Sequence, residues 1–233
     1  MNHLHIYIGT SGFAYREWRG SFYPAEITAG DMLAFYSSLF KTVEINATFY
    51  KMPSRQIMEQ WSRQVPEDFC FALKAPALIT HYKKLLNVED EMLSFMKALK
   101  GLDGHLGPLL FQLPPSLAAD QNLLKNFLGL LTGTQAAVEF RHPSWFTDDT
   151  YKALENAGCA LCVSDREDLP EPPLIRTARF GYLRLRRDSY DQKSLKEWRE
   201  RVNAQGWEEA FVFFRHEKTG QGTKLAELFQ RLA

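Results

Sequence analysis

The stretch AVEFRHPSWF, residues 137–146, begins like a buried strand and then carries charges. The apolar pair 137–138 is typical of a strand interior, and Pro143 ends the run. Glu139 and Arg141 stand two residues apart, and therefore on one face of a strand. An ionised group in an apolar interior is costly unless it is paired. We therefore expect these two side chains either to belong to a polar site or to form an ion pair that supports the fold.

Short apolar runs of the same kind recur along the whole chain. They cover residues 6–9, 42–48, 69–74, 108–113, 136–141, 159–165, 181–186 and 209–215. Segments with helical spacing alternate with them, at about 31–39, 54–62, 89–99, 119–131, 147–157, 192–204 and 223–232. This alternation predicts an α/β fold, a single (β/α)8 TIM barrel that forms one domain over residues 1–233. A doubly wound open sheet is the alternative.

Turn and cap residues refine this prediction. Thr147 and Thr223 are typical helix starts, and Gly158 stands where a helix should stop. The sixth crossover contains DLPEPPLIRT, residues 168–177, whose three prolines predict a loop in place of a helix.

Composition restricts the class of protein. The chain has 233 residues, 45% of them hydrophobic, and 28 basic residues balance 28 acidic ones. Zero net charge gives no general indication of nucleic-acid binding. No apolar stretch is long enough to span a membrane, and we expect a cytoplasmic protein. Cys159 and Cys162 match C-x-x-C, but positions i and i+3 of a strand face opposite sides, which predicts two buried thiols.

Polar side chains stand at the ends of the predicted strands. In a TIM barrel the carboxyl ends of the strands carry the chemistry, and the period of two turns these residues towards the barrel interior. The set consists of Glu44, Asn46, Thr48, Lys74, Gln112, Glu139, Arg141, Asp165, Tyr182, Arg184, Arg186, Arg215 and His216. We expect them to converge on one polar site, although buried ion pairs that only support the fold remain the alternative for each residue.

Five ordered motifs resemble the YecE-like family, also known as domain of unknown function 72. They are IGTSGFAYREWRGSFYP (8–24), TVEINATFYKMPS (42–54), FALKAPALITHYKKL (71–85), LGPLLFQLPPS (106–116) and VEFRHPSWF (138–146). The resemblance implies a TIM barrel related to the xylose isomerase and endonuclease IV group. It implies no settled activity, and the DNA-related role suggested for the family follows from fold alone.

The resemblance also assigns residues to a site. By motif these are Gly9, Ser11, Gly12, Glu44, Asn46, Thr48, Tyr50, Lys74, Thr80, His81, Gln112, Glu139, Arg141, His142 and Trp145. The last quarter departs from the family pattern, which commonly has Arg-x-His-Gly at the end of strand 7 and an asparagine at the end of strand 8. The resemblance still supports Arg184 as a site residue, but the departure leaves Arg186, Arg215 and His216 without support.

Anion binding fits these residue types better than metal binding. Glu44, Glu139 and Asp165 offer oxygen ligands, but neighbouring cations would oppose a metal ion, and we predict no metal site. Arginine forks match phosphate or carboxylate oxygens. In KTGQGT, residues 218–223, small Gly220 and Gly222 would let a phosphate approach a helix start, unless they simply form a glycine-rich loop.

Acid–base chemistry completes the candidate mechanism. Glu139 beside Arg141 should be ionised and able to accept a proton, whereas Glu44 could be neutral if desolvated. Lys74 could stabilise an oxyanion or form a Schiff base. Trp18, Phe22, Tyr23, Tyr50 and Trp145 either form an aromatic rim for a sugar or base or pack under the loops.

We therefore expect an enzyme that binds a small anionic, phosphorylated or carboxylated, sugar-like substrate at the barrel mouth. A nucleic-acid-binding barrel like endonuclease IV and a non-catalytic ligand sensor are the alternatives. The basic loop THYKKL, residues 80–85, suits the first alternative, but it is also a normal solvated loop. No pattern identifies a cofactor, the reaction or the oligomeric state.

Overall fold

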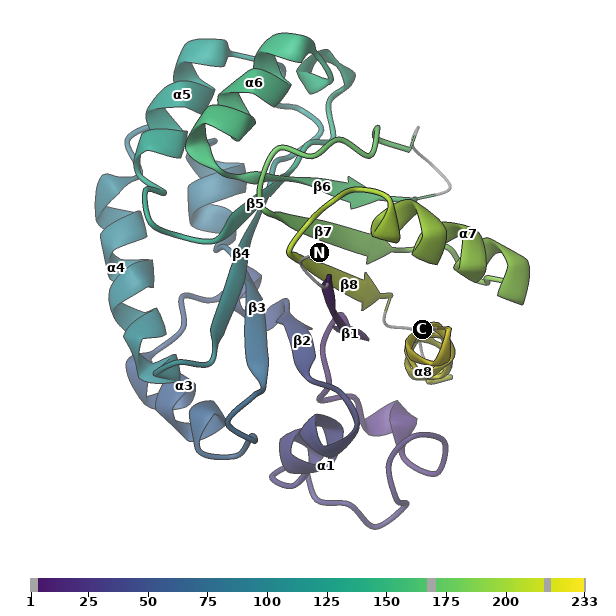
Figure 1. Cartoon of the computed structure of the whole chain (residues 1–233). Coiled ribbons are helices and arrows are strands. Elements are labelled where there is room, and N and C mark those ends of the chain that lie inside the picture. Colours follow the sequence, from purple (N-terminus) through teal and green to yellow (C-terminus); the bar gives the residue numbers. More distant parts are fainter. Residues whose placement is uncertain (1–3, 167–170, 216–218, 233) are drawn as a thin grey trace.

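The computed structural model describes residues 4–166, 171–215 and 219–232, in which helices alternate with eight strands (Figure 1). Each strand falls on one of the eight apolar runs. The strands are β1 His5–Thr10, β2 Thr42–Ile45, β3 Cys70–Lys74, β4 Leu106–Gln112, β5 Ala136–Glu139, β6 Ala160–Ser164, β7 Phe180–Leu185 and β8 Glu209–Phe214.

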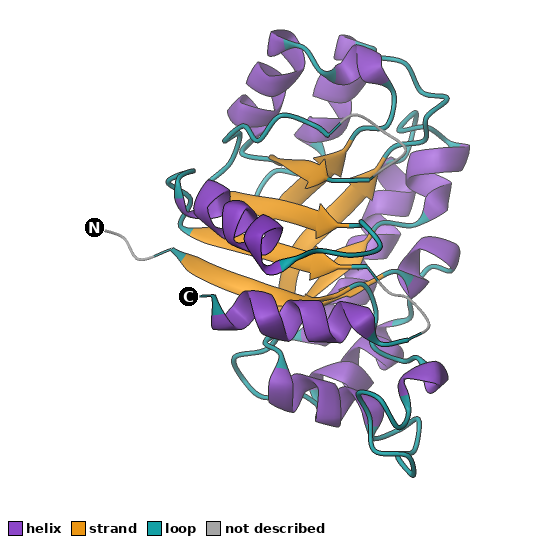
Figure 2. Ribbon diagram, turned by 90° about the vertical axis from the view of Figure 1, so that its right-hand side faces the viewer, coloured by secondary structure: helices purple, strands orange, loops and turns teal. Residues whose placement is uncertain are grey.

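The helices lie around the outside of the strands, as Figures 1 and 2 show. They are α1 Met32–Leu39, α2 Ala47–Tyr50, α3 Arg55–Ser62, α4 Glu89–Leu99, α5 Gln121–Gly129, α6 Asp148–Ala157, α7 Gln192–Asn203 and α8 Gln221–Arg231. Short helical turns occupy Arg16–Trp18, Leu78–Tyr82, Lys100–Leu102 and Pro143–Trp145. In the described part of the chain, no helix is both long enough and apolar enough to span a bilayer.

The strands follow the order β1-β8-β7-β6-β5-β4-β3-β2, and every pairing is parallel. The two ends of this order meet through a bridge between Ser11 and Glu44, and Gly12 N donates to Glu44 O at 2.7 Å. The sheet is therefore a nearly closed (β/α)8 TIM barrel, as predicted, and the alternative of an open doubly wound sheet is wrong.

Alternate strand residues separate into two apolar clusters. The larger cluster contains buried residues of both helices and strands, so it is the layer between them. The smaller one contains strand residues such as Ala72 and Ala137, so it fills the barrel interior. Cys159 belongs to the first and Cys162 to the second, and both thiols are buried and free. Burial raises the pKa of Cys159 to about 11. The prediction of two buried thiols on opposite faces is confirmed.

Two of the three predicted helix signals are confirmed. Thr147 caps α6 by accepting a hydrogen bond from Thr150 N at 3.4 Å, and Gly158 ends this helix with a left-handed φ of 65°. The third signal is wrong, because α8 begins at Gln221, directly after Gly220. The Thr223 hydroxyl lies within the first turn of α8 and donates to the carbonyl of Gly220 at 2.7 Å.

The sixth crossover contains no helix over residues 171–179, which agrees with the loop expected there; residues 167–170 lie outside the described part. Glu171 anchors this crossover through ion pairs with Arg187 at 3.3 Å and Arg201 at 2.7 Å. Arg201 belongs to α7, so the crossover is fixed to an outer helix.

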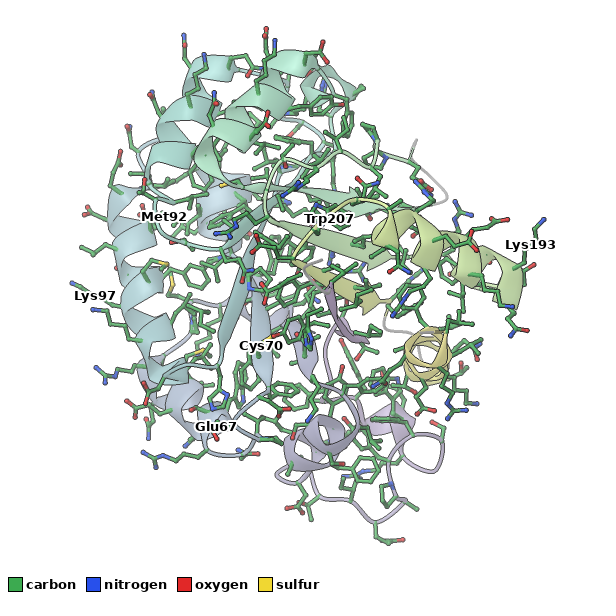
Figure 3. The ribbon with its side chains drawn as sticks, viewed as in Figure 1. Glu67, Cys70, Met92, Lys97, Lys193 and Trp207 are labelled. Atoms are coloured by element: carbon green, nitrogen blue, oxygen red, sulfur yellow. The ribbon has the colours of Figure 1, made fainter. Side chains whose placement is uncertain are left out.

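Close packing near the amino end of β7 explains why residue 181 is a glycine. A Cβ on Gly181, in β7, would lie 2.4 Å from the ring of Trp207, which precedes β8 and is labelled in Figure 3. That ring is buried, so it has no room to move away.

We expect Gly181→Ala to lower the free energy of unfolding by about 1–3 kcal/mol, because the added methyl group overpacks the contact with Trp207. Gly129→Ala, at the end of α5 where nothing lies within 4 Å, should be neutral or stabilise by up to about 1 kcal/mol. Urea denaturation of both variants measures the difference, and equal stabilities would contradict this account of the packing.

Candidate functional site

Arg184 on β7 lies between two carboxylates that come from other strands. Its Nε and Nη2 donate to Glu44 Oε2 and Oε1 at 2.8 and 2.9 Å, and its Nη1 donates to Glu139 Oε2 at 2.6 Å. All three residues are at most 4% exposed. The guanidinium therefore joins β2, β5 and β7 inside the barrel. It makes a bidentate contact with Glu44 and a single hydrogen bond to Glu139.

Glu44 accepts further hydrogen bonds from several directions. Ser11 Oγ donates at 2.7 Å and Asn46 Nδ2 at 3.0 Å, both to Oε1. Tyr182 donates its hydroxyl to Oε2 at 2.9 Å, and Arg186 Nη2 donates to Oε1 at 3.0 Å. This carboxylate is thus surrounded by donors, as a buried anion requires.

Glu139 connects to Lys74 through an amide. Lys74 Nζ donates to Gln112 Oε1 at 2.8 Å, and Gln112 Nε2 donates to Glu139 Oε1 at 2.8 Å. Arg141 Nε also donates to Glu139 Oε1, at 3.2 Å, and the Lys74 ammonium lies 3.7 Å from the centre of the Phe49 ring. The resulting ionic network consists of Glu44, Lys74, Gln112, Glu139, Arg141, Arg184 and Arg186.

Both network carboxylates are ionised. Burial alone would raise their pKa, but neighbouring donors and charges together outweigh it, chiefly Arg184, with Arg186 beside Glu44 and Arg141 beside Glu139. The pKa of Glu139 falls to about 2, and that of Glu44 lies well below its usual range. The expectation of a neutral Glu44 is therefore wrong, because its neighbours include two guanidinium groups as well as amides and hydroxyls.

Lys74 is shifted in the direction that favours its neutral form. Burial and then the nearby charge of Arg184 lower the pKa of the Lys74 amine to about 7, against the smaller opposing effects of Glu139 and Glu44. Near neutral pH this amine therefore exists in both protonation states. Its side chain can both donate and accept a proton there.

A cavity of about 640 Å³ borders the network at the carboxyl ends of the strands. We call it the anion cavity because most of its charged lining residues are basic. It is lined by Ser11, Tyr15, Asn46, Tyr50, Lys74, Gln112, Arg141, Ser164, Arg166, Arg184, Arg186, Asp188 and Arg215. Six of these side chains are basic and only Asp188 is acidic. Arg215 pairs with Asp188 at 2.7 Å, so the single lining carboxylate already has a partner.

The structure brings together the central residues predicted from the sequence. Seven of the predicted site residues line the anion cavity, namely Ser11, Asn46, Tyr50, Lys74, Gln112, Arg141 and Arg184. Glu44 and Glu139 are hydrogen-bonded to lining residues and lie buried behind them. Arg186 and Arg215, which the family pattern left unsupported, also line the cavity, whereas His216 lies outside the described residues.

Other predicted residues are not among those that line this cavity. They are Gly9, Gly12, Thr48, Thr80, His81, His142, Trp145, Asp165, Tyr182, Gly220 and Gly222. Thr48 stands on α2 because β2 ends at Ile45, and its hydroxyl donates to Lys74 O at 2.6 Å. Asp165 accepts hydrogen bonds from Arg186 N and the Tyr190 hydroxyl, both at 2.6 Å, and so orders the chain after β7.

Most of the expected aromatic rim is packed under the loops. Trp145 is fully buried, stacks on Phe140 at 4.8 Å and donates to Leu117 O. Trp18 and Tyr23 are also buried. For these three side chains the structure therefore agrees with the second alternative, packing under the loops, and not with an aromatic rim. Tyr50, which is 84% exposed and lines the cavity, remains available to a ligand.

Local contacts account for the remaining histidines and glycines. His81 Nδ1 is 2.9 Å from the Thr80 hydroxyl, and His142 Nδ1 is 2.8 Å from Ser144 Oγ. A Cβ on Gly222 would lie 2.2 Å from Arg215 O, and Gly220 has a left-handed φ of 74°. Close packing therefore requires Gly222 and the backbone conformation favours Gly220, as in the glycine-rich-loop interpretation.

The arrangement of carboxylates offers little to a cation. Among the described residues, no three His, Cys, Asp or Glu side chains form a group that could hold a metal ion. Glu44 and Glu139 both bind Arg184, so a metal ion between them would have to displace a buried guanidinium.

Sequence reasoning missed four lining residues, namely Tyr15, Ser164, Arg166 and Asp188. Ser164 had a usable signal. Cys162 and Ser164 share one face of β6 by the period of two, and Ser164 pairs in register with Arg184. The sequence-based prediction named the adjacent carboxylate, Asp165, as the polar residue at the end of this strand.

The fold and the site together define a (β/α)8 barrel protein with an ionic network and a cationic cavity at the carboxyl ends of its strands. A family model described as "Protein of unknown function DUF72" matches residues 7–233. The chain belongs to this DUF72 family, which confirms the YecE-like resemblance.

Known relatives agree with this assignment. The chain is 30% identical over 155 residues to UPF0759 protein YecE of Escherichia coli K12, a match that covers 66% of this chain and 54% of YecE. It is 26% identical over 227 residues to UPF0759 protein YunF of Bacillus subtilis, covering 91% and 78%. Just over half the length of YecE is therefore matched.

Solved structures show the same fold. A crystal structure of a DUF72 family protein from Thermotoga maritima superimposes with a TM-score of 0.86 at 30% identity, over 99% of both chains. A DUF72 family protein from Enterococcus faecalis has a TM-score of 0.81 at 18% identity, covering 97% of this chain and 94% of the other. The second likeness supports the fold alone.

We expect Glu44→Gln to lower the free energy of unfolding by about 3–5 kcal/mol, since it leaves Arg184 and Arg186 short of a buried negative charge. Glu208→Gln is the matched control, because it breaks an exposed pair with Arg179 and should cost less than about 1 kcal/mol. Chemical denaturation measures both. A loss below 1 kcal/mol at Glu44 would show that the ionic network does not stabilise the barrel.

Proposed function

We propose that the anion cavity binds a small organic anion, phosphorylated or carboxylated, and that the protein is an enzyme acting on it. The observation that carries this proposal is the excess of basic side chains around the cavity, six against one acidic residue. Cavities of about 640 Å³ fall in the range that holds small molecules.

The ionic network supplies positive charge that its own carboxylates do not balance. Lys74, Arg141, Arg184 and Arg186 are basic, and only Glu44 and Glu139 are acidic, so the network carries two net positive charges when Lys74 is protonated. Both carboxylates are directed at guanidinium groups within the network. A bound phosphate or carboxylate would compensate the remainder.

Neutral polar groups suit the rest of a sugar-like molecule. Ser11, Tyr15, Asn46, Gln112 and Tyr50 contribute hydroxyl and amide groups to the cavity wall. Hydroxyl and amide groups exchange hydrogen bonds with sugar hydroxyls, because each can donate and accept. This mixture of basic and neutral polar side chains favours a hydroxylated anion over an apolar one at this end of the site.

Lys74 is the group best suited to proton transfer. A pKa of about 7 places it near the ambient pH, where general acid–base catalysis is most efficient. Glu139, the base expected from the sequence, has a pKa of about 2 and accepts protons weakly at neutral pH. We therefore assign proton transfer to Lys74, with Schiff-base formation by the same amine as the second chemistry open to it.

Phosphate or sulfate should raise the melting temperature more than chloride at equal ionic strength. A ligand at 100 times its dissociation constant stabilises by about 2.7 kcal/mol. Arg141→Gln should weaken the affinity for phosphate at least tenfold, because Arg141 lines the cavity. Arg179→Gln, in an ion pair that is not part of the cavity lining, should keep the effect.

Thermal-shift titrations with phosphate, ribose 5-phosphate and a short oligonucleotide test this prediction. Equal melting temperatures in phosphate and chloride up to tens of millimolar would contradict an anion site. A shift with the oligonucleotide but not with ribose 5-phosphate would favour the nucleic-acid-binding alternative.

Lys74 should react with acetic anhydride with a pH midpoint near 7, because only the neutral amine is a nucleophile. Bound phosphate should move the midpoint to higher pH, since a nearby anion favours the protonated amine. Peptide mass spectrometry compares Lys74 with Lys193, which extends from α7 at the surface (Figure 3). Identical pH profiles for the two lysines would contradict the assignment.

A further inference from the structure

A second cavity, of about 370 Å³, adjoins the anion cavity and differs from it in chemistry. Its lining consists of Glu139, Phe140, Arg141, Pro143, Phe146, Ser164, Arg166, Glu171, Pro172 and Pro173. Half of these residues are phenylalanine or proline. We call it the apolar recess.

The recess and the anion cavity share a wall. Arg141, Ser164 and Arg166 line both of them. A ligand whose charged group is bound beside Arg141 can therefore extend another part into the recess without leaving the site. The basic residues stand at the junction, and the aromatic and proline side chains lie beyond it.

The walls of the recess come from two loops that the proposed function has not used. Pro143 and Phe146 follow β5, where Phe146 packs edge-on against Phe140 at 6.5 Å. Pro172 and Pro173 belong to the crossover between β6 and β7. The ion pairs of Glu171 anchor that crossover, and each proline has a restricted φ, so this wall is held in place.

Ser164 provides a second, independent observation at the junction. It is 6% exposed, and its Oγ is buried and has no hydrogen-bond partner among the described residues. A buried hydroxyl without a partner is costly. A polar ligand atom at the junction of the two cavities would give it one.

We propose that the substrate is an amphipathic anion, with its phosphate or carboxylate in the anion cavity and an aromatic or branched aliphatic group in the apolar recess. Ser164 Oγ donates a hydrogen bond to the polar atom that links the two parts. This inference rests on the proposed function and narrows its substrate class from any small anion to one with an apolar substituent.

Phenyl phosphate and inorganic phosphate are the probes, and calorimetric titration measures their dissociation constants. Phenyl phosphate should bind at least tenfold more tightly to the unaltered protein, because its ring leaves water for the recess. Phe146→Ala should reduce this advantage to less than threefold while keeping the affinity for phosphate. Leu93→Ala, at an exposed leucine on α4, is the control and should leave the advantage unchanged.

Two further variants keep the test decisive. Pro173→Ser, at an exposed position of the same wall, should also reduce the phenyl advantage and serves if Phe146→Ala does not fold. Ser164→Ala should weaken phenyl phosphate about three- to tenfold, which corresponds to one hydrogen bond. An unchanged affinity in Ser164→Ala would overturn the role of that hydroxyl.

The outcomes separate this inference from the proposed function. Binding of phosphate without any phenyl advantage would overturn the recess as a subsite and leave anion binding intact. A phenyl advantage that survives both Phe146→Ala and Pro173→Ser would place the ring elsewhere and also overturn it. Failure of both anions to bind would overturn the two proposals together.

Discussion

The contact of Arg184 with Glu44 and Glu139 is the interaction on which the rest of this barrel mouth depends. Three charges lie almost fully buried between β2, β5 and β7. Desolvation of each charge is expensive, and the hydrogen-bonded geometry offsets it only while all three partners are present. The contact therefore favours one arrangement of strands that are distant in the sequence, and it keeps every attached side chain in place.

The electrostatics of the site follow from the same guanidinium. Arg184 helps to hold both carboxylates in their ionised form, and after burial it is the next largest cause of the lowered pKa of Lys74. Burial and this one guanidinium together thus separate the roles of its neighbours. Glu44 and Glu139 become fixed counter-charges, and Lys74 becomes the group that titrates near neutrality. A layer of fixed charge behind a layer of basic side chains is an arrangement suited to holding an anion next to a proton donor.

Sequence patterns predicted the barrel and the centre of the site because both depend on local periodicity. The period of two placed Glu44, Lys74 and Arg184 on inner faces without any knowledge of distances. It did not predict which inner residues meet across the barrel, so the ionised state of Glu44 was missed. The choice of Asp165 over Ser164 shows a different limit. Asp165 was predicted as a site residue because it is charged, although Ser164 has the position that faces the barrel interior. The Asp165 carboxylate accepts a hydrogen bond from Tyr190 and does not line the anion cavity.

The geometry of Glu139 is compatible with both interpretations of this residue, as part of an ion pair that supports the fold and as part of a polar site. Its carboxylate pairs with Arg184 and Arg141, as a residue that supports the fold would, and it also borders the apolar recess. An anion that binds at Arg141 and Lys74 adds negative charge to a network that has an excess of positive charge. Binding therefore relieves repulsion among the basic side chains and favours protonation of Lys74. The charge that stabilises the folded barrel is the same charge that would recognise the proposed ligand, so stability and recognition would be coupled through Arg184.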